Sequence, residues 1–131
     1  MAYLTDSDVI ADWLEGRSEA VQLLSSLAPS GLSISLITYG EIYEGIYCSR
    51  DPKESERIFI EFLRDVDVLP LNKGIMKGFA RIRGHLRATG RVIGDFDVLI
   101  ADTAIHHQLT LVSRNVRHFD RVPGLSIYQS S

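Results

Sequence analysis

The 131-residue chain has one cysteine and no long apolar run. The lone Cys48 excludes an intrachain disulfide framework and any zinc site built from several cysteines. No apolar stretch approaches the roughly 18 residues that a membrane span needs. The N-terminal segment lacks the basic start and the long apolar centre of a signal peptide. From these absences we expect a cytoplasmic protein with no membrane partner.

The composition is that of an ordinary globular protein. Hydrophobic residues make up 45% of the chain and charged residues 24%, which excludes intrinsic disorder and fibrous repeats. The length suits one hydrophobic core. We therefore expect a single domain over residues 1–131.

Acidic residues are absent between Val68 and Gly94, and this gap is part of a charge asymmetry. The formal net charge is −3, which taken alone argues against a nucleic-acid partner because phosphate contacts need cationic surface. Residues 1–67, however, hold 13 acids against 5 bases, whereas residues 68–131 hold 9 bases against 4 acids. Arginine outnumbers lysine by 11 to 3, and arginine is the better phosphate ligand. Any function has to account for this division.

Short apolar segments alternate with helical patterns along the chain. This alternation predicts an α/β fold with a parallel sheet. Strands are expected at Ala2–Leu4, Leu32–Ile37, Val66–Leu71, Thr110–Val112 and Leu125–Tyr128. Helices are expected from Asp8 to Leu14, from Ser18 to Leu27, from Thr38 to Cys48, from Asp51 to Val66, from Asn72 to Gly90 and from Asp95 or Asp97 to Ile105, with a helical turn at Asn115–Phe119.

Several oxygen-bearing side chains follow the predicted strands. Asp6 comes after the first strand, Glu41 starts the helix after the second, and Asp97 starts a later helix. Ser113 and Asn115 follow the strand at 110–112. Ligands bind at the carboxyl ends of the strands in an open parallel sheet, so these side chains can converge on one point.

Converging carboxylates repel one another, and burial would force a proton onto one of them. A divalent cation removes this conflict, and Mg²⁺ and Mn²⁺ prefer oxygen ligands and bridge to phosphate oxygens. Such a site suits phosphodiester cleavage. The sequence has no G-x-S-x-G motif, and Cys48 has no compelling base partner, so no other strong nucleophile is evident.

Each acid also has a purely local interpretation. Glu41 can complete a capping box that begins at Thr38. Asp95 can cap the next helix, and Asp97 can interact with the dipole of that helix. Asp6 can form a turn. One carboxylate can serve a local role and a catalytic role together.

Four segments carry a resemblance to a known family. They are Tyr3–Ile10, Thr38–Gly45, Asp97–Ala101 and Leu111–Phe119, and together they span nearly the whole chain. In this order the sequence resembles PIN-domain ribonucleases of the VapC type, the toxin half of a toxin–antitoxin pair. The signature D-x-L-I-A at Asp97–Ala101 matches that family's pattern.

The resemblance implies a three-layer α/β/α sandwich with a five-stranded parallel sheet of order 3-2-1-4-5. It implies a metal-dependent endoribonuclease that uses metal-activated water and thereby inhibits translation or growth. Asp6, Glu41 and Asp97 would hold Mg²⁺ or Mn²⁺, and Asn115 would be the fourth catalytic residue, where many relatives carry Asp. The implied partners are RNA, a second copy of the chain and a cognate VapB-like antitoxin.

Further residues are expected around these four. We expect Asp8, Asp95 and Ser113 to lie around the metal ligands and to orient them. Asp8 stands where the family often has Asn, and Ser113 replaces the more usual Thr. Asp102 is expected to be structural because it points away from Asp97 around the helix. RNA contacts are expected at Arg87, Arg91, Arg114 and Arg117.

Two other functions remain open at this point. The chain could be a PIN fold that only binds RNA or protein, because Asn115 lowers the charge of the ligand set. Alternatively, Asp6 and Asp8 resemble the D-x-D motif of haloacid-dehalogenase-type phosphatases, with Thr38, Lys73 and Asp95 in further roles. The second acid expected shortly after Asp95 in that family is missing.

Overall fold

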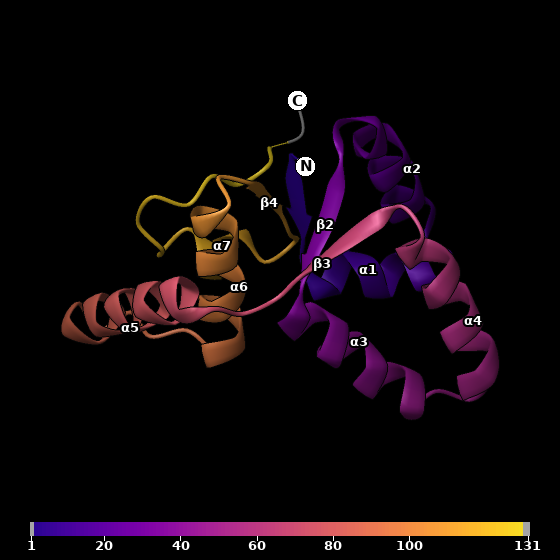
Figure 1. Cartoon of the computed structure of the whole chain (residues 1–131), viewed down its shortest axis with the longest axis horizontal. Helices are drawn as coiled ribbons and strands as arrows, with labels where there is room; N and C mark the ends of the chain where they lie inside the picture. Colours follow the sequence, from indigo (N-terminus) through magenta and orange to yellow (C-terminus); the bar gives the residue numbers. More distant parts are fainter. Residues whose placement is uncertain (1, 130–131) are drawn as a thin grey trace.

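A parallel sheet lies at the centre of the computed structural model, which describes residues 2–129 (Figure 1). The strands are β1 (Tyr3–Thr5), β2 (Leu32–Ser35), β3 (Val66–Leu69) and β4 (Thr110–Val112), in the order β3-β2-β1-β4. Tyr3 of β1 stands opposite Leu32 on one side and opposite Thr110 on the other. All three pairings are parallel, so every strand ends at the same edge of the sheet.

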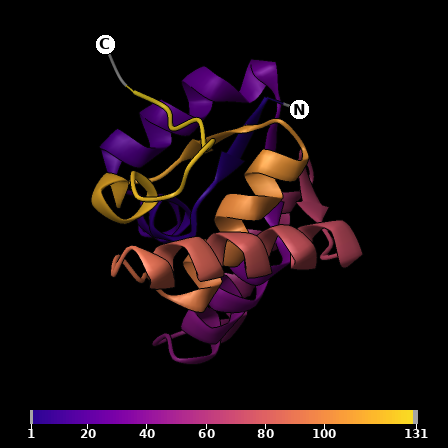
Figure 2. The ribbon, with the colours of Figure 1, turned by 90° about the vertical axis from the view of Figure 1, so that its left-hand side faces the viewer.

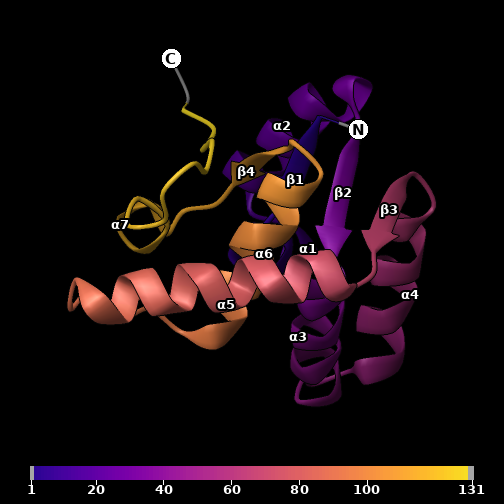
Figure 3. The same ribbon diagram turned by 60° about the vertical axis from the view of Figure 1, so that its left-hand side comes forward.

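Helices cover both faces of this sheet. Figure 2 and Figure 3 show α5 lying across α6, while α3 and α4 run side by side away from them. The helices are α1 (Ser7–Leu14), α2 (Ser18–Leu27), α3 (Leu36–Tyr47), α4 (Pro52–Leu63), α5 (Lys73–Ala88), α6 (Asp95–His106) and α7 (Val116–Phe119), with a 3-10 turn η1 (Ala28–Ser30).

Two apolar clusters form the core, one on each face. Along β1, Leu4 packs into the cluster of α5, α6 and α7, and its neighbour Tyr3 packs against the cluster of α1 to α4. Leu111 and Val112 of β4 divide in the same way. Because successive strand side chains alternate between faces, each central strand serves both clusters, which gives the expected three layers.

The predicted fifth strand is wrong. At Leu125–Tyr128 the chain makes only an isolated parallel bridge between Leu111 and Ile127. The amide of Leu111 donates to Ser126 at 2.8 Å, and its carbonyl accepts from Tyr128 at 2.8 Å. Both bonds belong to one residue of β4, so no ladder extends beyond it. Over residues 2–129 the sheet therefore has four strands in the order 3-2-1-4 instead of five.

The predicted helix start at Thr38 is also wrong, whereas the starts at Ser18 and Asp95 are confirmed. β2 ends at Ser35, whose Oγ caps α3 by accepting from the Thr38 amide, so Thr38 and Glu41 do not form a capping box. Helix α2 begins with Ser18 itself, and Arg17 precedes it. Gly94, with extended backbone, precedes α6 where Asp95 was expected as a cap. Capping depends on where the chain leaves the sheet, which local sequence does not fix.

Other expectations are confirmed. Asn72 Oδ1 accepts from the Ile75 amide and caps α5, and Asp51 caps α4 just before Pro52. Within residues 2–129, none of the helices has the length and apolar character to cross a membrane.

Candidate metal centre and RNA-cleavage site

Asp6 is the buried carboxylate at the end of β1. Its backbone amide donates to the Val112 carbonyl at 2.8 Å, which ties it to the end of β4. Its Oδ1 accepts from the Ser7 amide at 2.8 Å and caps α1. Its Oδ2 accepts from Ser113 Oγ at 2.7 Å. The residue is only 6% exposed, so strand pairing and capping together fix this carboxylate at the edge of the sheet.

The surroundings of Asp6 oppose its negative charge. Burial, helped by the neighbouring charges of Asp8 and Asp97, raises the pKa of Asp6 to about 7, although the hydrogen bonds from Ser113 and Ser7 pull it down. Asp6 is therefore poised between its two protonation states near neutral pH. A cation beside it would favour the carboxylate.

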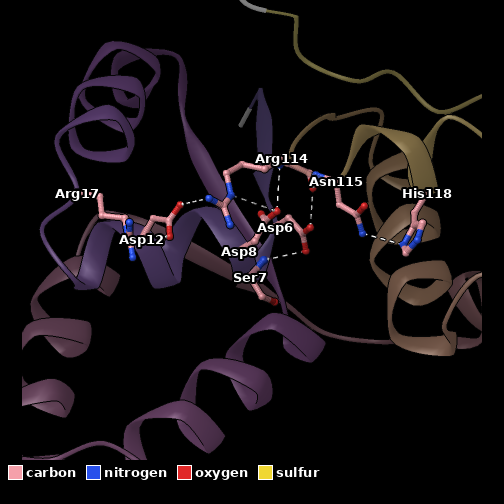
Figure 4. Close-up of polar contacts among 9 residues, drawn as sticks. Asp6, Ser7, Asp8, Asp12, Arg17, Arg114, Asn115 and His118 are labelled. Atoms are coloured by element: carbon pink, nitrogen blue, oxygen red, sulfur yellow. Dashed lines mark hydrogen bonds and ion pairs between the residues drawn. The ribbon is translucent and has the colours of Figure 1, made fainter.

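Asp8 is the second residue of α1, and it shares Arg114 as a partner with Asp12. Its Oδ2 accepts from the Arg114 amide at 3.0 Å, while the Arg114 guanidinium reaches Asp12 Oδ2 at 3.0 Å (Figure 4). Asp12 also lies 3.4 Å from Arg17 Nε. Burial raises the pKa of Asp8 despite Arg114. Its Oδ1 is buried without a hydrogen-bond partner, so the carboxylate has an unused acceptor at the site.

Glu41 reaches the site through Ser7. The Ser7 hydroxyl donates to Glu41 Oε1 at 2.6 Å and lies 3.1 Å from Thr38 Oγ1. Since Ser7 directly follows Asp6, this contact connects the start of α1 to the second turn of α3. Ser7 thus contacts both carboxylates, Glu41 through its hydroxyl and Asp6 through its amide.

Asp97 and Asn115 meet at His118. The Asn115 side-chain nitrogen lies 2.8 Å from His118 Nδ1 (Figure 4). Asp97 Oδ2 lies 3.6 Å from the same nitrogen. The Asn115 backbone amide donates to Ser113 Oγ at 2.9 Å. One hydroxyl therefore connects Asn115 to Asp6.

The PIN-domain family model matches residues 3–125 of the chain. This chain is a PIN domain. Among its relatives, ribonuclease VapC1 of Haemophilus influenzae is 30% identical over 127 residues, covering 95% of both chains, which places the PIN domain in the VapC group. The tRNA(fMet)-specific endonuclease VapC of Shigella flexneri is 27% identical over 125 residues, again covering 95% of both chains.

Solved structures agree with this assignment. The DNA-bound VapBC structure from Salmonella typhimurium superposes on the PIN domain with a TM-score of 0.90 at 26% identity, covering 98% of this chain and 97% of that one. Membership of this family favours the nuclease interpretation of Asp6 and Asp8 over the phosphatase interpretation.

The acids of this PIN domain fit a hard divalent cation held partly by water. Among residues 2–129, no three His, Cys, Asp or Glu side chains are grouped closely enough to enclose a metal on their own. Mg²⁺, however, keeps several waters and is commonly held by one or two carboxylates and a substrate phosphate. Asp97 lies close enough to Asp6 for its charge to raise the pKa of Asp6. Asp8 has an unused acceptor at Oδ1. These carboxylates supply the oxygen ligands that such a cation needs.

The other predicted residues lie around this centre in different ways. Asp95 is exposed and forms an ion pair with Arg83 at 2.8 Å, so its partner is on α5. Arg114 is committed to Asp8 and Asp12. The side chains of Arg87, Arg91 and Arg117 belong to exposed residues. Their contacts with RNA stay a prediction.

Sequence reasoning missed His118 and the linking role of Ser7. No sequence pattern marked His118 as part of the site, yet it contacts both Asn115 and Asp97. The available signal was its position three residues after Asn115, which puts both on one face of a short helix. Ser7 gave a signal only through its place beside Asp6, because Glu41 lies 34 residues away.

Proposed function

We propose that this protein is a metal-dependent endoribonuclease and the toxin of a VapBC-type toxin–antitoxin pair. The observation that carries the proposal is the buried Asp6, whose pKa is raised to about 7 by burial and then by the neighbouring acids, so that a cation beside it would stabilise its charged form. Support comes from relatives named as ribonucleases over nearly the whole length of the chain. Cleavage of cytoplasmic RNA would inhibit translation or growth.

The proposed site assigns a role to each acid. Asp6 and Asp97 would hold Mg²⁺ or Mn²⁺, with Glu41 as the further ligand. When bound, the cation would lower the pKa of water and offset the charge that develops on the phosphate. Ser113 orients Asp6 by donating to Oδ2, and Ser7 orients Glu41. Asn115 restrains His118, which lies beside Asp97.

RNA cleavage tests this proposal directly. Purified protein is incubated with labelled RNA and Mn²⁺, and Asp6→Asn is compared with Asp67→Asn. Asn is as good a helix cap as Asp, so Asp6→Asn should remain folded while losing its ligand charge. Asp67 is exposed on β3 and serves as the matched control. Cleavage that survives both EDTA and Asp6→Asn would contradict the metal mechanism.

The same assay separates the enzyme from a PIN domain that only binds. A binding module would retain RNA without cutting it and would show no Mn²⁺ affinity that depends on Asp6 or Asp97. Calorimetry with Mn²⁺ measures the second property without relying on turnover.

The proposed partner is a VapB-like antitoxin, because similar structures are named as VapBC complexes. We also propose that the protein is a homodimer. Adding the product of an adjacent short reading frame should abolish RNA cleavage, whereas an unrelated DNA-binding protein of similar size should not. Light scattering should give about twice the chain mass of 14.7 kDa.

A further inference from the structure

Helix α3 has a hollow beside the carboxylates. Leu36, Gly40 and Glu44 lie at intervals of four residues and so share one face of the helix. Gly40 is exposed, and a Cβ added there would meet nothing within 4 Å. The missing side chain therefore leaves an empty place between Leu36 and Glu44.

Phe96 of α6 forms the other wall of this hollow. The resulting open cavity has a volume of about 390 Å³ and is lined by Leu36, Ile37, Gly40, Glu41, Glu44 and Phe96. That volume is within the range of small-ligand pockets, roughly 300–1,000 Å³. Phe96 is 55% exposed and Leu36 is 44% exposed, so apolar surface faces the cavity without being covered. We call this feature the Gly40 cavity.

The Gly40 cavity shares Glu41 with the proposed cleavage site. Glu41 lines the cavity and also accepts from Ser7 next to Asp6. Phe96 directly precedes Asp97. A group in the cavity is therefore a close neighbour of a phosphate held at Asp6 and Asp97, and in RNA the close neighbours of a phosphate are a ribose and its base.

The lining of the Gly40 cavity favours a base over a second phosphate group. Two carboxylates, Glu41 and Glu44, repel a phosphate group. A flat, uncharged base suits an exposed aromatic ring, because protein–RNA recognition commonly stacks unpaired bases on aromatic side chains. We propose that the Gly40 cavity holds one nucleobase next to the scissile phosphate, stacked on Phe96, and that Glu44 favours guanine there.

The preference for guanine follows from hydrogen-bonding groups. A carboxylate only accepts, and guanine presents two adjacent donors, N1–H and the 2-amino group, on its Watson–Crick edge. Uracil presents a single N–H between two carbonyl oxygens. A carboxylate repels these carbonyl oxygens, because both groups are acceptors. This inference rests on the proposed function, since it adds a specificity subsite to the same ribonuclease centre.

Two variants test the cavity without touching the acids at Asp6 and Asp97. Gly40→Leu fills the hollow, and leucine favours a helix more than glycine does, so the fold is retained. Phe96→Ala removes the stacking surface. Gly84→Leu is the matched control, because Gly84 is an exposed glycine of α5 with nothing within 4 Å of an added Cβ.

The measurement uses a pool of single-stranded RNA randomised around its centre, with Mn²⁺ and sequencing of the cut ends. Wild-type protein should enrich guanine at one position beside the cut. Gly40→Leu and Phe96→Ala should flatten that preference and lower kcat/KM on the best RNA about ten-fold, the loss expected for one stacked base. Glu44→Gln should still cleave but should lose its discrimination between guanine and uracil. Gly84→Leu should match wild type.

Different failures are distinguishable in this experiment. Absence of cleavage by wild-type protein would overturn the proposed function and this inference with it. Cleavage with the same base preference in wild type, Gly40→Leu and Phe96→Ala would overturn only the inference. A second copy of the chain is the other possible occupant, and light scattering tests for it. If Phe96→Ala loses a dimer while keeping the base preference, the cavity is a contact between copies, which would contradict the nucleobase assignment.

Discussion

Ser113 Oγ donates a 2.7 Å hydrogen bond to Oδ2 of Asp6 across 107 positions of sequence. This bond favours the charged form of Asp6 and lowers its pKa, against the larger effect of burial. Ser113→Ala should therefore raise the pKa of Asp6 further and reduce the metal-binding carboxylate near neutral pH. Since a hydrogen bond to a charged group contributes about 1.5–3 kcal/mol, cleavage at pH 7 should fall about ten-fold and recover partly in alkaline buffer.

The pH profile of RNA cleavage checks this expectation. Ser113→Thr keeps the hydroxyl and should restore the wild-type profile. Ser25→Ala, at an exposed position on α2, is the matched control. A uniform loss in Ser113→Ala at every pH would contradict a role through Asp6.

Burial of Asp6 also makes the stability of the metal-free protein pH-dependent. The folded pKa of about 7 exceeds the ordinary value of 3.8, so between these values the folded state binds more protons than the unfolded state. The free energy of unfolding therefore falls as pH rises from about 4 to about 7. At 1.36 kcal/mol per pKa unit, the Asp6 contribution is as much as about 4 kcal/mol.

Urea unfolding in EDTA across this pH range gives the required comparison. The difference between wild type and Asp6→Asn isolates the Asp6 contribution, because the other titrating groups are common to both proteins. A difference that stays constant with pH would show that Asp6 does not titrate in this window.

Metal binding should compete with this proton. Mn²⁺ should raise the melting temperature more at pH 8 than at pH 6, because at pH 6 the cation must first displace the proton of Asp6. Asp6→Asn and Asp97→Asn should lose most of the shift, and Asp67→Asn should keep it. Calorimetry in buffers of different ionisation enthalpy would measure the released proton. Equal shifts at both pH values would argue against binding at Asp6.

Gly78 of α5 and Asp102 of α6 define the contact between these two helices. A Cβ added to Gly78 would overlap the carboxylate of Asp102, which is 5% exposed. Gly78→Ala should therefore destabilise the fold by about 1–3 kcal/mol. Asp102→Ala in the same chain should recover much of the loss. Gly84→Ala, with open space around it, should instead be neutral or stabilising by up to about 1 kcal/mol.

Unfolding free energies of the two single variants and the double variant form a complete cycle for this pair. Additive effects would indicate that Gly78 and Asp102 do not interact.

Arg117, exposed on α7, is the sharpest test of the predicted RNA surface. Arg117→Ala should weaken binding of single-stranded RNA and reduce the slope of log affinity against log salt by about 0.7, the value for one released counterion. Arg57→Ala is the control, since Arg57 is paired with Glu54 at 2.6 Å on α4. Binding would be measured with Asp6→Asn to prevent cleavage. An equal salt slope in wild type and Arg117→Ala would remove this residue from the RNA surface.

The sequence by itself determined the alternation of strands and helices, the parallel sheet, and Asp6, Glu41, Asp97 and Asn115 as the residues to consider. These features are local: hydrophobic period, turn residues and acids placed after strands can be read within a few positions. The helix starts at Asn72 and Asp51 were also local and are confirmed, and both residues cap their helices.

Only the tertiary structure decided how those residues meet. Ser7 joins Glu41 to Asp6, Ser113 joins Asp6 to Asn115, and His118 joins Asn115 to Asp97, through contacts that depend on where separate strands end. The missing fifth strand has the same cause, because a ladder depends on how long two distant segments stay parallel. Local patterns set what each segment prefers, whereas packing and strand pairing between distant segments set which preferences survive.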